Sequence, residues 1–254
     1  MGSEMCIRDR FIIIPLAFSS STYLSFPPPG FSLRWFQSFF SDDSWVSALS
    51  MSLIVGIMAT VLALLFGISA AIGLSKWNFK GKDFIEQIFL LPMMIPSIII
   101  AVGLFRFESQ LAISGSVIGL IIAHTVIALP YVIAAVYTQM SEINNEYENA
   151  ALSLGAGPLQ AFFRVTLPLI KSSIISGGLF AFSISFDEVV ITQFIAGVDT
   201  TTLPIKIWEG VRSALDPTIT AISAIIIVGV TAMMFILNFR ALFPKRNALN
   251  KKEN

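Results

Sequence analysis

The run WVSALSMSLIVGIMATVLALLFGISAAIGLS, from Trp45 to Ser75, contains no Lys, Arg, Asp or Glu. A helix needs about 20 apolar residues to cross the roughly 30 Å hydrocarbon core of a bilayer. Small residues recur in this run at four-residue spacing, as in Ser52, Gly56 and Thr60, which lets a neighbouring helix approach closely. The stretch therefore predicts a membrane-spanning helix that packs against other helices.

The composition of the whole chain also indicates a membrane protein. Of its 254 residues, 55% are hydrophobic and 13% are charged, and the mean hydropathy is +0.80, which is too apolar for a soluble domain. The formal net charge is zero, so the chain offers no basic field for nucleic acid. The single cysteine, Cys6, excludes a disulfide within the chain. We expect no metal site, and we interpret the only histidine, His124, as a satisfied helix-packing residue.

Further apolar runs predict an all-α fold, a polytopic membrane helix bundle of about six transmembrane helices. Charge-free runs cover 87–105, 109–141 and 217–239, and prolines at 92, 96 and 130 should kink their helices. A fifth run, 170–197, is interrupted by Asp187 and Glu188. The sixth, 11–26, is shorter and rich in serine after Phe18. Residues 1–10 fit neither a signal peptide nor a membrane helix, so we treat them as a doubtful N-terminal extension, which leaves open whether the first helix is truncated.

The distribution of positive charge predicts the orientation of the bundle. Cytoplasmic loops carry an excess of Lys and Arg, and twelve of the sixteen basic residues fall on one side of the predicted spans. We therefore place both termini, the loop 76–82 and the loop 142–168 in the cytoplasm. The predicted transmembrane domain is 11–240, followed by a basic cytoplasmic tail at 241–254. The basic residues on the cytoplasmic side are Arg8, Arg10, Lys76, Lys80, Lys82, Arg164, Lys171, Arg240, Lys245, Arg246, Lys251 and Lys252; those on the other side are Arg34, Arg106, Lys206 and Arg212.

Three short helices are predicted outside the hydrocarbon. The aromatic stretch FSLRWFQSFF, Phe31 to Phe40, is suited to a helix in the outer membrane interface. The stretch NEYENAALSLGAGPLQAFFRVTLP, Asn145 to Pro168, has helix formers up to Leu154, a glycine turn, and Pro158 to restart a second helix that ends at Leu167 and Pro168. In its first helix Tyr147, Ala150, Ala151 and Leu154 share a face, and such a small apolar face suits a partner's groove.

The same stretch resembles the EAA loop of ABC importer permeases. The resemblance rests on two alanines, three intervening residues, a glycine, nine further residues and the ending Val-Thr-Leu-Pro. Asn149 stands where the family has glutamate, so a polar contact of that glutamate would have to come from Glu148 or Glu146. The resemblance implies that this loop couples the chain to an ATPase through Glu148, Asn149, Ala150, Ala151, Gly155, Ala156, Leu167 and Pro168.

A longer stretch, roughly 31–240, resembles the second permease subunit of spermidine/putrescine-type importers. The resemblance rests on Ser185 to Val190 (SFDEVV) and on Thr202-Leu203-Pro204. It implies a type I ABC importer permease in a bacterial inner membrane, transporting a small cationic solute such as a polyamine. The implied partners are two ABC ATPase subunits, a sister permease, an extracytoplasmic solute-binding protein and membrane lipid. The sequence has no GxxxxGK[ST] phosphate-binding loop, so we expect a non-catalytic subunit without cofactors, with ATP and Mg on the partner ATPase.

The acidic pair in the fifth run is the predicted substrate pathway. If the run is helical, Asp187 and Glu188 lie about 24 to 26 Å from Lys171 and point about 100° apart. Carboxylates in hydrocarbon are costly and should face the bundle interior or a water-filled cavity. We expect Asp187 to line the pathway, Glu188 to be a second cation contact or a partner-facing structural group, and Phe182 and Phe186 to supply cation–π surface. The alternatives are a structural salt bridge or hydrogen bond to the sister permease, and surface exposure at the outer rim.

Roles for other acidic residues, and functions other than ABC import, have less support in the sequence. Glu108 and Glu209 are interpreted as solvated charges on outer loops, or as contacts for a docked binding protein. Related permeases carry phosphonate, thiamine or ferric iron, so these solutes stay open. A proton-coupled secondary transporter using the acidic pair would have no use for a docking loop. An intramembrane enzyme would need a nucleophile with a base or a metal set inside the spans, which the sequence lacks.

Overall fold

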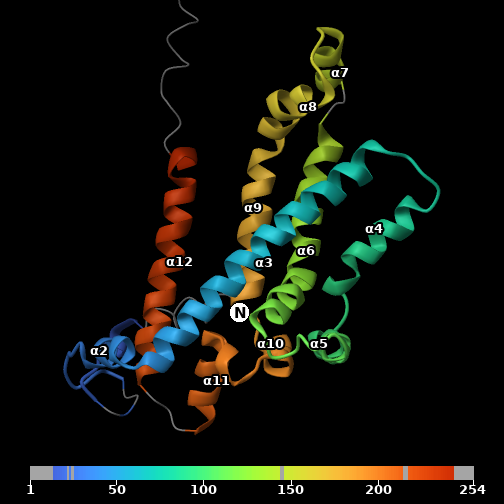
Figure 1. Cartoon of the computed structure of the whole chain (residues 1–254). Helices are drawn as coiled ribbons and strands as arrows, with labels where there is room; N and C mark the ends of the chain where they lie inside the picture. The colour runs from blue at the N-terminus through green and yellow to red at the C-terminus, as the bar shows by residue number, and fades with distance from the viewer. Residues whose placement is uncertain (1–13, 22, 24–25, 144–145, 214–216, 243–254) are drawn as a thin grey trace, which may run out of the picture. The chain divides into compact units, whose positions relative to one another are not determined.

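A computed structural model describes residues 14–21, 23, 26–143, 146–213 and 217–242. Within these ranges every extended regular element is a helix, as the sequence predicts (Figure 1). Contacts divide the chain into two compact units, one of residues 47–206 and one of residues 1–46 with 207–254. The loop 142–168 and the acidic pair both belong to the first unit. Residues 1–10 and the tail from 243 onward lie outside the described residues, so the domain limits proposed there stay predictions.

Three helices form the core of the 47–206 unit: α3 (Asp43–Lys76), α6 (Val117–Glu142) and α9 (Leu167–Phe186). Helices α6 and α9 lie side by side and pack extensively (Figure 1). A Cβ atom added to Gly177 of α9 would lie 3.3 Å from the Cα atom of Val132 in α6. One added to Gly67 of α3 would lie 2.8 Å from the Val132 side chain. Because glycines of α3 and α9 face Val132, both helices approach this residue closely. Val132 is fully buried.

The run 87–105 does not form one straight span. Helix α4 (Lys82–Leu90) continues as a 3₁₀ turn at Leu91–Met93, and α5 (Ser97–Gln110) then leaves at an angle of 101°. Kinks at Pro92 and Pro96 are thus confirmed, but the bend is sharper than the predicted single helix allows. Proline has no backbone N–H and its ring disfavours helical geometry in the preceding residue, so two prolines within five residues end the first helix.

The run 170–197 is also broken. Helix α9 ends at Phe186, residues 187–189 are not helical, and α10 (Val190–Ile195) follows. The predicted 100° divergence of the acidic side chains on one helix is therefore wrong, because the two carboxylates lie in the break itself. Helix α10 packs against α5 and α6. Near its end, the Gly115 N–H donates to the carbonyl of Ile195 at 2.8 Å, which ties α10 to the turn before α6.

The second unit contains α2 (Arg34–Ser41), which packs against α12 (Thr218–Leu242). The predicted aromatic helix is thus present, within the described part of the chain, at Arg34–Ser41. The Trp35 indole donates to the carbonyl of Ser19 at 2.9 Å, and the rings of Phe18 and Phe36 are 5.1 Å apart. Its location in the membrane interface stays a prediction. Helix α11 (Leu203–Ser213) begins in the 47–206 unit, where the Leu203 N–H donates to Ser52 Oγ at 2.8 Å.

The described residues include three helices long and apolar enough to cross a membrane: Asp43–Lys76, Val117–Glu142 and the continuous helix Pro158–Phe186. The bent pair formed by α4 and α5 is a fourth if it is counted as one span. The predicted spans at 45–75 and 109–141 correspond to the first two, and α12 occupies the predicted span at 217–239. The predicted span at 11–26 begins outside the described residues, so the total of six stays a prediction.

The contact at Gly177 leads to a prediction about packing. Gly177→Val should destabilise the 47–206 unit, because branched carbons would meet the α6 backbone at Val132. Overpacking of this kind costs about 1–3 kcal/mol. The expected result is a lower thermal midpoint of the purified protein in detergent.

Gly103→Val in α5 is the matched control, because a Cβ there has no atom within 4 Å and the residue is exposed. Equal midpoints for the two variants would show that the approach of α9 to α6 does not depend on Gly177.

Candidate functional site

A helical elbow extends beyond the ends of α6 and α9 (Figure 1). It comprises α7 (Glu146–Ser153), the turn 154–157 and α8 (Pro158–Ala161). The turn ends α7 with two backbone hydrogen bonds: the Gly155 N–H donates to the Leu152 carbonyl at 3.0 Å and the Ala156 N–H to the Ala151 carbonyl at 3.1 Å. This is the Schellman pattern, and it places Gly155 at φ +88°, where glycine is favoured. The predicted helix, glycine turn and second helix are therefore all present.

The elbow exposes apolar side chains. Leu154 is 89% exposed and Leu159 75% exposed, and Tyr147, Ala150 and Phe163 are exposed as well. A hollow of about 330 Å³ lies inside the elbow. Exposed apolar side chains next to a hollow suit docking of another protein surface. Ala151, Gly155 and Ala156 of the predicted coupling set line this hollow, together with Leu154, Gln160, Ala161, Arg164 and Val165.

Glu148 anchors the elbow from its inner side. Its Oε1 atom accepts a hydrogen bond from Lys76 Nζ at 2.5 Å, and its Oε2 atom accepts one from Thr166 Oγ1 at 2.8 Å. Partial burial raises the pKa of this carboxyl, but the bonds from Lys76 and Thr166 and the Lys76 charge lower it more, so the pKa lies below its ordinary value. The Glu148 carboxylate therefore joins α7 to the end of α3 and to the base of α9. Asn149 and Glu146 are exposed.

The sequence predicts that the second arm of the elbow ends at Leu167 and Pro168. In the structure this arm continues beyond them. A π-helical turn at Phe162–Thr166 joins α8 to α9, and the Leu167 N–H donates to the carbonyl of Phe162, five residues back. The wider turn precedes Pro168, whose missing N–H and bulky ring would disrupt an ordinary helix at this point. The helix therefore runs continuously from Pro158 to Phe186. Pro168 lies in the first turn of α9, a position that proline tolerates.

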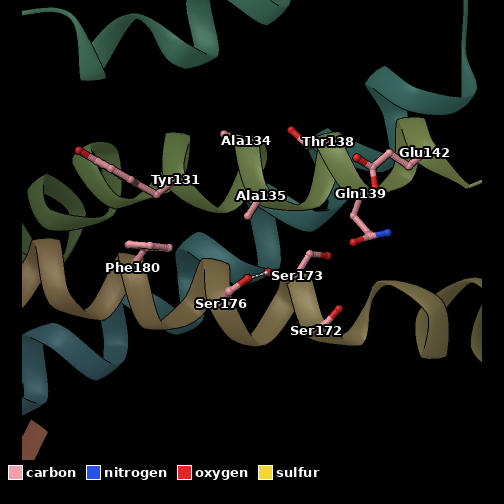
Figure 2. A pocket seen from close by; sticks show the side chains of 10 residues that line it. All are labelled: Tyr131, Ala134, Ala135, Thr138, Gln139, Glu142, Ser172, Ser173, Ser176 and Phe180. Atoms are coloured by element: carbon pink, nitrogen blue, oxygen red, sulfur yellow. Dashed lines mark hydrogen bonds between the residues drawn. The ribbon is translucent and has the colours of Figure 1, made fainter. Parts of the chain in front are cut away.

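A groove of about 690 Å³ follows the junction of α6 and α9. Figure 2 shows Tyr131 and Phe180 near one end, and Gln139, Glu142 and Ser172 near the other. Ser176 donates to the carbonyl of Ser173 at 3.2 Å, along the floor of the groove. The lining therefore combines hydroxyl, carboxamide and carboxylate groups with two aromatic rings. Its members are Tyr131, Ala134, Ala135, Thr138, Gln139, Glu142, Ser172, Ser173, Ser176 and Phe180.

The groove residues on α9 continue a stripe that ends at the acidic break. Ser172, Ser176, Phe180, Ser183 and Asp187 are all exposed and follow one another at intervals of three or four residues. Such spacing places them along one face of the helix. The groove is not among the sites predicted from the sequence, although the spacing of these polar residues indicates it. Without knowledge of which α9 face contacts α3 and α6, the exposed face could not be identified.

The four predicted pathway residues do not share one environment. Asp187 is exposed, and no described residue donates a hydrogen bond to its carboxylate. The Glu188 carboxylate is half-buried and accepts the Ile191 N–H at 2.9 Å, which caps the start of α10. Phe182 lies over Gly56 of α3, and Phe186 stacks on Phe182 at 5.5 Å. Of the four, Asp187 alone continues the exposed stripe, while Glu188 acts as a helix cap.

His124 and Glu108 are buried polar residues close to α10. His124 is satisfied, as predicted: its Nδ1 atom lies 2.8 Å from Ser185 Oγ and its Nε2 atom 2.8 Å from Thr192 Oγ1. The interpretation of Glu108 as a solvated charge is wrong, because its side chain is fully buried against Gly119, in the first turn of α6. The positive end of the α6 helix dipole partly compensates a carboxylate at this position.

Several known proteins are similar to this chain in sequence. The spermidine/putrescine transport system permease protein PotC of Haemophilus influenzae is 32% identical over 199 residues, covering 78% of this chain and 77% of that protein. The putrescine transport system permease protein PotI of Escherichia coli is 32% identical over 243 residues, covering 93% and 86%. A putative 2-aminoethylphosphonate transport system permease protein, PhnV of Salmonella typhimurium, is 32% identical over 206 residues, covering 78% and 77%.

The fold is shared with a chain from a bacterial ABC transporter involved in the import of the acidic polysaccharide alginate. That crystal structure matches with a TM-score of 0.72 and 15% identity, covering 94% of this chain and 91% of the other. The family described as binding-protein-dependent transport system inner membrane component matches residues 63–245. With this match and the three relatives above, the chain belongs to that family, as a multi-pass inner-membrane permease subunit of an ABC importer.

Proposed function

We propose that this permease imports a small solute carrying ammonium groups, most simply a polyamine. The observation that carries the proposal is the exposed stripe on α9, which leads from the hydroxyl-lined groove to the free carboxylate of Asp187. Carboxylates compensate ammonium charge, hydroxyls replace hydration, and aromatic faces attract cations. Tyr131 and Phe180 supply such faces in the groove. The spermidine/putrescine relatives support the same substrate class.

A phosphonate bearing an amine is the second candidate. PhnV, named for 2-aminoethylphosphonate transport, is as similar in sequence as the two polyamine relatives. Its amine could use Asp187, but its phosphonate would need positive charge, and the groove is lined by no Lys or Arg. Uptake by the reconstituted transporter separates the candidates: labelled spermidine or putrescine should be imported, and excess 2-aminoethylphosphonate should not compete. Effective competition would favour the phosphonate.

Energy would reach this chain through the elbow. In this proposal two ATPase subunits, which carry the ATP and Mg, close and open, and one of them receives the exposed face of α7 and the hollow beside it. The apolar side chains Leu154 and Leu159 support a docking role, because they have few contacts within their own chain. A solute-binding protein delivers the substrate on the opposite side, and a sister permease completes the pathway around the groove.

The elbow would then lie in the cytoplasm together with both termini, as the distribution of positive charge predicts. Lys76 at the end of α3 and Arg164 in the π-helical turn are both on this side. A cysteine placed at exposed Leu154, in a chain with Cys6→Ser, should react with a membrane-impermeant thiol reagent only in inside-out vesicles. Reaction in intact cells would reverse the orientation.

Asp187→Asn should slow import of a polyamine roughly five- to tenfold, because the neutral amide no longer attracts ammonium groups along the pathway. Uptake should be measured in proteoliposomes containing the complete transporter, with ATP inside and saturating binding protein. Asp199→Asn is the matched control, since Asp199 is also exposed and lies beyond α10. Equal rates for wild type and Asp187→Asn would remove Asp187 from the pathway.

Gly155→Val should uncouple transport from ATP hydrolysis while leaving membrane insertion intact. A β-branched residue at φ +88° is strained by roughly 1–2 kcal/mol, which distorts the turn between the two arms. Gly157→Val is the control, because Gly157 has φ −71° and, like Gly155, has open space around its Cβ position. The measurement is solute imported per ATP hydrolysed. Coupling that is equal in both variants would contradict a docking role for the turn.

Breaking the Lys76–Glu148 pair should loosen the elbow. Lys76→Glu places two carboxylates together and should cost about 1 kcal/mol, with faster hydrogen exchange across α7 and weaker coupling. The double variant with Glu148→Lys should restore slow hydrogen exchange across α7 and normal coupling. The ammonium introduced at position 148 can donate to the carboxylate introduced at position 76 and to Thr166 Oγ1. Failure of the double variant to recover would mean that the ion pair does not hold the elbow.

The same pair gives a pH dependence. A carboxyl whose pKa is lowered on folding stabilises the fold above its unfolded pKa, about 4.3, and loses this effect as the pH falls through the lower folded value. The Lys76–Glu148 ion pair therefore contributes its full stabilisation at neutral pH.

A further inference from the structure

The imidazole of His124 connects the two sides of the α9–α10 break. Ser185, in the last turn of α9, lies 2.8 Å from Nδ1, and Thr192, in the first turns of α10, lies 2.8 Å from Nε2. All three side chains are at least 97% buried. His124 itself is on α6, so a third helix holds the two ends of the interruption.

Each ring nitrogen has a hydroxyl as its hydrogen-bond partner, and a neutral imidazole donates from one nitrogen and accepts at the other. When Thr192 Oγ1 donates to the Glu188 carbonyl at 3.0 Å, its oxygen accepts from Nε2, and Nδ1 accepts from Ser185. In this arrangement both ring nitrogens and both hydroxyls are satisfied by a neutral histidine. The chain of bonds runs from α9 through the ring to the backbone of the break.

The far end of α10 is fixed to the same helix. The Gly115 N–H donates to the Ile195 carbonyl at 2.8 Å, and Thr200 Oγ1 donates to the Gly115 carbonyl at 3.3 Å. Gly115 directly precedes Ser116, the N-cap of α6. Hydrogen bonds therefore attach one end of α10 to α6 and the other end to the turn before α6. Among these contacts, only the one from Ser185 attaches the end of α9 to α6.

We propose that His124 is a positioning residue that sets the geometry of the break and, through it, the place of Asp187 at the end of the α9 stripe. This inference rests on the proposed role of Asp187 in the pathway. The imidazole does not touch the pathway itself, since it is buried while Asp187 is exposed. It acts through Ser185 and Thr192, and Thr192 in turn holds the carbonyl of Glu188, next to Asp187.

The geometry can be measured without transport. Spin labels on cysteines at Ser183, in α9, and at Asp199, beyond α10, report the distance across the break in the complete transporter with Cys6→Ser. Both positions are exposed. The distribution should be narrow in the wild type and at least twofold broader with His124→Phe, which keeps a ring but no hydrogen bond. The control pair, labels at Ser172 and Ser183 on α9 alone, should not change.

Transport then tests the consequence. Solute imported per ATP should fall at least fivefold in His124→Phe and recover in His124→Gln, whose carboxamide can still donate to Thr192. Thr192→Val combined with His124→Phe should cause no further loss, because both act through one contact. If His124→Phe does not assemble, Thr192→Val alone should broaden the Ser183–Asp199 distribution.

An unchanged distribution in either variant would overturn the positioning role. A broadened distribution with unimpaired import would support that role and would contradict the proposed role of Asp187 instead.

Discussion

A peptide group inside a bilayer has no water to bond, so each interruption of a helix needs partners supplied by the protein. Within the described residues, the interruptions of the predicted spans have an identifiable supply. At the α9–α10 break, Glu188 caps the Ile191 N–H and Thr192 returns a bond to the Glu188 carbonyl. The bend between α4 and α5 contains two prolines, which have no N–H to satisfy.

The elbow and the α9–α10 break are joined by one long helix. The helix from Pro158 to Phe186 has 29 residues, which corresponds to about 44 Å at 1.5 Å per residue. It begins in the elbow and ends at the acidic break. Glu148 fixes the other arm of the elbow to Lys76, at the end of α3. In the proposed coupling, a displacement of the elbow would act on α3 and α9 together, because the elbow is bonded to the end of α3 and is continuous with α9.

Local rules made much of this predictable from the sequence. The charge-free run from Trp45 to Ser75 predicted α3, and Gly155 and Pro158 predicted the turn and the restart of the elbow. The predictions that were wrong concern features that depend on tertiary contacts. Pro168 looked like a helix end because the π-helical turn that accommodates it has no residue signature. Glu108 looked solvated because it lies in the predicted outer loop between the runs 87–105 and 109–141, whereas its burial depends on how α5 packs onto the first turn of α6. The split between Asp187 and Glu188 depends on a break that composition alone cannot locate.

The position of Glu148 also explains how the elbow tolerates Asn149. A carboxylate one residue earlier points inward, where Lys76 and Thr166 already occupy both of its oxygens. The exposed side chains of the elbow include Asn149 and Glu146 as well as the apolar Leu154 and Leu159. Recognition by shape and apolar contact is weakly affected by salt, whereas an ion pair at an exposed interface would be screened. In the proposed docking, the internal anchor at Glu148 and the exposed apolar contact at Leu154 and Leu159 are thus made by different residues.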